Sequence, residues 1–134
     1  MSTSRQIKEE QRVSGLQKGL VGELQALVKD IERCEKTVQG LKTELQAINE
    51  RHANRTTTQD DISYLEDLLA CARKKLVWEK QIGSLQKRTP ELMQRVEALV
   101  NHPNSNPDEE TQKALMGSLT EVQASMRRLN EIKI

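Results

Sequence analysis

Aromatic residues are almost missing from this sequence, which has no Phe, one Trp and one Tyr in 134 residues. Proline is also rare, with three residues. A β-sandwich or β-barrel needs many short strands rich in aromatic and β-branched residues, separated by frequent turns. The residues that dominate here are Leu, Glu, Lys, Gln and Arg, a composition typical of long helices. The sequence therefore predicts an all-α fold.

Long apolar runs and abundant cysteines are also lacking. No stretch approaches the roughly 18 consecutive apolar residues that a membrane-spanning helix needs, and the first twelve residues lack the apolar core of a secretory signal. Two cysteines are too few for a disulfide scaffold. We therefore expect a cytoplasmic protein with free thiols and no membrane span; a cytoskeleton-associated or nuclear location fits the same composition.

The charge is nearly balanced, with a net charge of +1 although 31% of the residues are charged. Basic clusters such as residues 73–75 and 127–128 are interspersed with acids, and no aromatic residues alternate with them to stack on bases. We expect no specific binding of nucleic acid. Solvated helix faces explain these clusters, and a salt-sensitive contact with an acidic surface, such as a tubulin tail or anionic lipid, is the most that they predict.

The residue types that carry chemistry are scattered. The residues that can bind zinc are Cys34, His52, Cys71 and His102. No two of them have the spacing of zinc ligands. The acid pairs at 60–61 and 109–110 stand at expected helix starts, where acids stabilise the positive end of the helix dipole. No nucleophile with a neighbouring base can be placed either. We expect no catalytic residue, no metal and no cofactor, and hence a protein that is not an enzyme.

A first helix is predicted over about residues 5–53, because apolar residues alternate there at intervals of four and three, the spacing of a heptad seam. The seam residues are Leu20, Leu24, Leu27, Ile31, Cys34, Val38, Leu41, Leu45 and Ile48. Going backwards, Leu16 and Val13 continue this seam only after one extra step of four. Such a step indicates a stutter, which locally unwinds a supercoil.

A second helix is predicted over about residues 59–101, after three threonines and two acids that favour a helix start. Its seam begins with Ile62, Leu65, Leu69, Ala72 and Leu76. The apolar pattern then shifts phase and continues with Trp78, Ile82, Leu85, Leu92, Val96 and Leu99. Because no turn residues interrupt this periodicity, we expect one helix that is kinked at Pro90.

A third helix is predicted over about residues 107–132, after the polar loop at 101–108. Its apolar stripe is Leu115, Leu119, Val122, Met126, Leu129 and Ile132. This helix is about half as long as either of the others. It should pair with helix two from Trp78 onward, and two extra apolar residues of helix one, Val21 and Val28, should meet it there.

These helices predict one domain, residues 1–134, with a defined architecture. The first two helices form a long antiparallel, coiled-coil-like hairpin, and the turn near 53–58 predicts that the numbers of facing residues add up to about 110, as for Leu41 and Leu69. The third helix packs on the proximal half of the hairpin. The result is a three-helix bundle, which we call the base, and a protruding two-helix arm.

Two groups of residues are candidate contact sites. Tyr64, Leu68 and Cys71 lie beside the predicted seam of helix two, on the arm, where no third helix covers them; they are our candidate partner-binding surface. Isolated exposed apolar residues are an equally good explanation of them. Gly15, Gly19 and Gly22 suggest a helix-packing contact, because each glycine in a helix costs about 1 kcal/mol relative to alanine. The favoured alternative is a loose helix start after Ser14.

The leading hypothesis is a protein-protein interaction module, an adaptor or scaffold subunit that binds helical or coiled-coil segments of other proteins through its arm. Cytoskeletal, centrosomal, kinetochore or trafficking assemblies use such modules, and a homodimer through the arm is compatible with this role.

Three antiparallel helices also resemble the architecture of BAG domains, which implies an Hsp70-type co-chaperone as the alternative. The basic tract that BAG domains carry at the start of their third helix is here largely acidic, at residues 108–113. No BAG-domain residues are therefore carried over to this chain.

Overall fold

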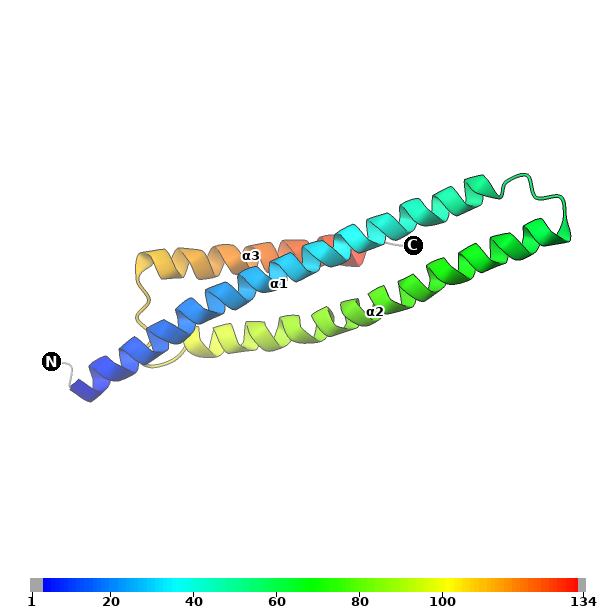
Figure 1. Ribbon diagram of the computed structural model, residues 1–134. Coiled ribbons are helices and arrows are strands. Elements are labelled where there is room, and N and C mark those ends of the chain that lie inside the picture. The colour runs from blue at the N-terminus through cyan, green and yellow to red at the C-terminus, as the bar shows by residue number, and fades with distance from the viewer. Residues whose placement is uncertain (1–3, 133–134) are drawn as a thin grey trace.

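The computed structural model describes residues 4–132, and most of them lie in three helices: α1 (Ser4–Arg51), α2 (Thr58–Val100) and α3 (Glu109–Glu131). Figure 1 shows α1 and α2 as an antiparallel hairpin, with α3 folded back along the half that contains the start of α1. No strand occurs in this range. The predicted all-α fold, with its long hairpin and its shorter third helix on the proximal half, is confirmed.

Polar side chains cap the starts of α2 and α3. At α2, the Thr57 hydroxyl accepts a hydrogen bond from the Asp60 backbone N–H at 3.1 Å, and the Asp60 carboxylate accepts one from the Thr57 N–H at 3.3 Å. This is a capping box, which satisfies N–H groups that have no partner within the helix. At α3, the Asp108 carboxylate accepts a hydrogen bond from the Thr111 N–H at 2.7 Å. These caps fix where the two helices begin.

The capping carboxylate of Asp60 predicts a loss of stability in acid. Hydrogen bonds from the Thr56 backbone, the Thr57 side chain and the Thr57 backbone lower the pKa of Asp60 below its ordinary value of 3.8. Because the folded-state pKa is the lower one, this contribution is present above pH 3.8 and is lost as the pH falls through the folded-state pKa. We expect the fall in unfolding free energy between about pH 5 and about pH 2 to be smaller in Asp60→Asn than in wild type. Urea denaturation followed by circular dichroism measures it, and identical pH dependence in the two proteins would contradict the assignment.

Pro90 lies inside α2 and does not end it. A proline lacks the N–H that would bond to the carbonyl four residues earlier. Next to it, the Thr89 hydroxyl donates to the Leu85 carbonyl at 2.8 Å. Because α2 runs from Thr58 to Val100, the prediction that one helix continues through Pro90 is confirmed, and the kink expected at Pro90 stays a prediction.

The seam of α1 runs without a break into its first half. Val13 and Gln17 are fully buried and stand at intervals of four and three before Leu20. Leu16, which the sequence placed in the seam, is exposed. The predicted stutter is therefore wrong, because a polar residue occupies the seam position and the heptad phase is kept.

The seam of α2 is also continuous. Its residues that are buried or packed against the core are Tyr64, Leu68, Cys71, Trp78, Ile82, Leu85, Leu92, Val96 and Leu99. Intervals of four and three connect all of them once the half-buried Lys75 and Thr89 are included. The seam predicted for the first half of α2 is therefore wrong. Its large residues, Ile62, Leu65, Leu69 and Leu76, are exposed.

Four ion pairs along one edge of the hairpin report its register. Between successive pairs, the α2 residue moves forward by one or two heptads and the α1 residue moves back by the same amount. The pairs, with N–O distances of 2.9 to 3.2 Å, are Asp67–Arg51, Lys74–Glu44, Arg88–Asp30 and Arg95–Glu23. Their side chains are partly exposed, so each pair contributes at most about 1 kcal/mol. Their constant spacing is nevertheless the signature of one uninterrupted register.

This register differs from the predicted one because, at the arm tip, the end of α1 and the start of α2 do not lie at the same level along the hairpin. The predicted register puts Glu44 opposite Glu66, whereas Glu44 meets Lys74. The last residue of α1, Arg51, pairs with Asp67, nine residues after α2 begins. The first two turns of α2 therefore extend beyond the end of α1, as the arm tip in Figure 1 shows.

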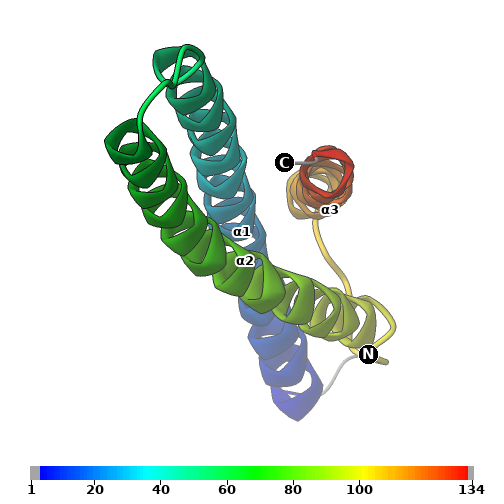
Figure 2. The same ribbon diagram turned by 90° about the vertical axis from the view of Figure 1, so that its right-hand side faces the viewer.

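Helix α3 approaches α1 much more closely than it approaches α2. Figure 2, which views the molecule from the arm end, shows α3 beside α1. The buried residues of α3 are Thr111, Leu115, Ser118, Val122, Ser125 and Leu129. The two serines in this seam are small, and small side chains let helix axes approach. The predicted pairing of α3 with α2 is therefore not the closest contact. Of the two α1 residues expected to meet α3, Val28 is buried and Val21 is packed against the core.

Candidate functional site

One face of α2 on the arm carries an exposed apolar row. Its large members are Ile62, Leu65, Leu69 and Leu76, whose exposed fractions are 43%, 62%, 52% and 58%. Ala72, also exposed, completes the series. The five residues follow one another at intervals of three and four, which is the spacing of a heptad seam. We call these five residues the arm row.

The arm row is exposed because α2 carries two apolar seams side by side, and α1 covers only one. Leu65 and Leu69 directly follow the seam residues Tyr64 and Leu68, and one residue is a rotation of about 100° around a helix. Helix α3 does not reach this face, because Arg128 near its end meets Glu35 of α1 at 3.8 Å, on the base side of the arm. Within residues 4–132, nothing is packed over the arm row as it is over the inner seam.

The predicted partner-binding residues lie on the covered side instead. Cys71 is buried, Leu68 is packed against the core, and the Tyr64 hydroxyl donates to Asn49 Oδ1 of α1 at 2.6 Å. Their expected exposure is therefore wrong. The cause is the difference in register, which turns α2 so that these three residues face α1 and the arm row faces outward.

Tyr64 also belongs to a polar cluster that holds the arm tip. The Arg55 guanidinium lies 3.9 Å from the centre of the Tyr64 ring, and the His52 ring is 5.4 Å from it, centre to centre. His52 Nε2 lies 2.7 Å from Asp67 Oδ2. These contacts tie residues 52–57 to the overhanging first turns of α2. They give Tyr64 a structural role that its place in the sequence did not reveal.

The three glycines of α1 make no close helix contact within the described chain. A Cβ atom added at Gly15, Gly19 or Gly22 would meet no atom within 4 Å among residues 4–132, apart from the helix itself. All three positions are exposed. A helix-packing contact at these glycines therefore does not form between α1 and the other described helices, and a contact with another molecule stays a prediction.

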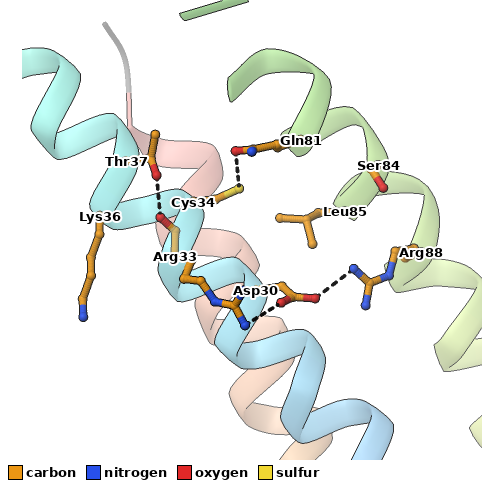
Figure 3. A pocket seen from close by; sticks show the side chains of 9 residues that line it. All are labelled: Asp30, Arg33, Cys34, Lys36, Thr37, Gln81, Ser84, Leu85 and Arg88. Atoms are coloured by element: carbon orange, nitrogen blue, oxygen red, sulfur yellow. Dashed lines mark hydrogen bonds and ion pairs between the residues drawn. The ribbon is translucent and has the colours of Figure 1, made fainter. Parts of the chain in front are cut away.

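A cavity of about 510 Å³ lies between α1 and α2. It stands on the edge of the hairpin that carries the four ion pairs, in the two-heptad interval between Lys74–Glu44 and Arg88–Asp30. Thr37 and Gln81, which both line it, occupy the positions where the heptad spacing would put the missing pair. Figure 3 shows Asp30 between Arg33 and Arg88, at 3.2 Å and 3.0 Å. Three of the four charged residues that line the cavity therefore pair with one another, and the cavity is a gap in the packing of the two helices.

Both cysteines are free thiols. Burial, with a smaller contribution from the nearby Asp30 carboxylate, raises the pKa of the Cys34 thiol. A raised pKa keeps a thiol protonated and unreactive. Among residues 4–132, no three His, Cys, Asp or Glu side chains are grouped so that they could hold a metal ion. In the same range, no helix has the length and apolar character to cross a membrane.

No family model, curated protein or solved structure matches this chain. The arm row is therefore the feature on which a function can be proposed. Fully burying a leucine or isoleucine side chain contributes about 1.5–3 kcal/mol relative to leaving it exposed, so covering four half-exposed ones would be a substantial driving force. Heptad spacing also means that another helix could insert its side chains between them.

Proposed function

We propose that this chain is a non-enzymatic interaction module that binds an α-helix of another chain through the arm row. The observation that carries this proposal is the spacing of the row. Single exposed leucines are common on soluble proteins, but five apolar residues at heptad spacing over positions 62–76 form a contiguous apolar stripe. A solvated helix face does not require such a stripe, whereas binding a helix does.

The rigidity of the arm supports the same proposal. The inner seam, the ion pairs at the edge and the contacts at the tip hold α2 along its length. The arm row is therefore already ordered before a partner arrives, which lowers the entropy cost of binding. As an adaptor or scaffold subunit, the chain would present this row away from the base, in cytoskeletal, centrosomal, kinetochore or trafficking assemblies.

Site-specific photo-crosslinking in cells tests this function. A photoreactive amino acid replaces Leu69 in one chain and Met116 in the other. Met116 is the matched control, because it is similarly exposed, at 61% against 52% for Leu69, but lies on α3 in the base. We expect crosslinks to helical segments from position 69 only, and we expect them to disappear when Leu65 and Leu76 are both changed to glutamate.

Two results would contradict the proposal. Crosslinks of the same kind and amount from both positions would show that the arm row is not a specific site, and no crosslink from position 69 would show that it binds nothing. Crosslinks to an Hsp70 chaperone that persist in the Leu65→Glu/Leu76→Glu chain would favour a co-chaperone of BAG-like architecture instead.

A further inference from the structure

We infer that the helix received by the arm row is the same arm row of a second copy of this chain. The two copies of α2 would run antiparallel about a two-fold axis that passes near Ala70 and Cys71. This inference rests on the proposed function and adds the identity and the direction of the partner. Two-fold dimers use the same patch on both subunits, so each contact occurs twice.

The apolar side chains match in this arrangement. Reversing the row about the axis places Leu65 against Leu76 of the second copy, and Leu69 against Ala72 of the second copy. A large residue opposite a small one lets two helices approach without leaving a void. At the outer end, Ile62 meets the charged Glu79 of the second copy, so the apolar contact stops there. The pairing is therefore short, and we expect a weak dimer that forms as the concentration rises.

The charges beside the row favour the antiparallel direction. Glu66 and Arg73 lie on one flank of the arm row, each one position after a row residue. In an antiparallel pair the equivalent flanks face each other. Glu66 then meets Arg73 of the second copy, and Arg73 meets Glu66 of the second copy. No ion pair within residues 4–132 involves either residue, so both charges are available for this contact.

A parallel pair would bring like charges together. In parallel coiled coils, a residue on one flank meets the residue five positions later on the opposite flank of the partner. Asp61 would then meet Glu66 of the second copy, and Lys75 would meet Lys80 of the second copy. Repulsion at both ends of the row therefore disfavours the parallel direction and leaves the antiparallel one.

Charge reversal tests the pairing. Glu66→Arg and Arg73→Glu each place like charges at both symmetric contacts, and both residues are exposed, so each variant should fold. By analytical ultracentrifugation, we expect wild type to move from its monomer mass of 15.3 kDa towards twice that mass as concentration rises. Each single variant should dimerise at least about tenfold more weakly. The double variant and an equimolar mixture of the two single variants should recover the dimer, because opposite charges face each other again.

The outcomes separate this inference from the proposed function. The control variant Met116→Glu should dimerise like wild type. A wild type that stays monomeric up to about millimolar concentration would overturn the inference, because association weaker than that is no longer specific. Charge variants that dimerise as well as wild type would also overturn it. If the chain stays monomeric but position 69 crosslinks to a helix of another protein, this inference fails and the proposed function stands.

Discussion

Replacing Trp78 with alanine is expected to lower the free energy of unfolding by about 3–5 kcal/mol, more than any other substitution considered for this chain. Trp78 is only 7% exposed and lies in the inner seam of α2, where the arm joins the base. Its Nε1–H also donates to the Cys34 carbonyl at 2.9 Å, so the indole ties the two long helices together. The alanine variant loses this contact and leaves a cavity that neighbouring side chains refill only in part.

Urea denaturation followed by circular dichroism at the helical minimum measures this loss. Fluorescence is unsuitable, because Trp78 is the only tryptophan. Trp78→Phe keeps an aromatic ring but removes the hydrogen bond, so its cost should be smaller. The neighbouring Val77→Ala is the matched control, because Val77 is exposed and its loss should change stability by no more than about 0.5 kcal/mol. Equal effects at positions 77 and 78 would show that the indole is not part of the core.

The fold was predictable because its causes are local. Heptad spacing, the Thr57 and Asp60 cap, and the polar loop before α3 all act within a few residues. The lengths of the helices then dictate the hairpin and the position of α3 on its proximal half. Each predicted helix limit lies within about two residues of the observed one, the usual uncertainty of a helix end.

The heptad phase was harder to predict, because polar residues occupy seam positions. Gln17 is fully buried, and its Nε2 donates to Ser105 Oγ at 2.8 Å and to the Leu99 carbonyl at 3.3 Å. The partners of Gln17 come from the end of α2 and the following loop, more than eighty residues away. Nothing near Gln17 in the sequence indicates that they exist. Counting only apolar residues therefore moved the seam to Leu16.

Lys75 is a second polar residue in a seam position, and passing over it led the sequence analysis to the wrong candidate binding surface on α2. Two rows of α2 have heptad spacing, and the distance by which the start of α2 extends beyond the end of α1 decides which row faces α1. That distance depends on contacts at the arm tip, which the spacing of apolar residues in the sequence does not indicate. A signal was nevertheless present: counting backwards from Leu85 and Trp78 at intervals of three and four leads through Lys75 to Cys71. If the heptad spacing had been continued through Lys75, the inner seam would have been assigned correctly and the arm row identified as the exposed face of α2.

A comparison of Leu68→Glu with Leu69→Glu tests this choice between the two rows directly. Leu68 packs against the core, whereas Leu69 is half exposed in the arm row. A carboxylate at position 68 would have to enter the inner seam, so we expect the unfolding free energy to fall by about 2–3 kcal/mol. At position 69 the carboxylate stays in water, and the change should be within about 0.5 kcal/mol.

Urea denaturation at low micromolar concentration measures both values without a contribution from self-association. Equal losses of unfolding free energy in the two variants would mean that neither row alone faces α1. A larger loss in Leu69→Glu than in Leu68→Glu would mean that the seam predicted from the sequence faces α1 and that the arm row is not an exposed surface. The expected order also decides how binding must be tested. Glutamate at position 69 removes the docking surface from a folded protein, whereas glutamate at position 68 would weaken binding by destabilising the arm itself.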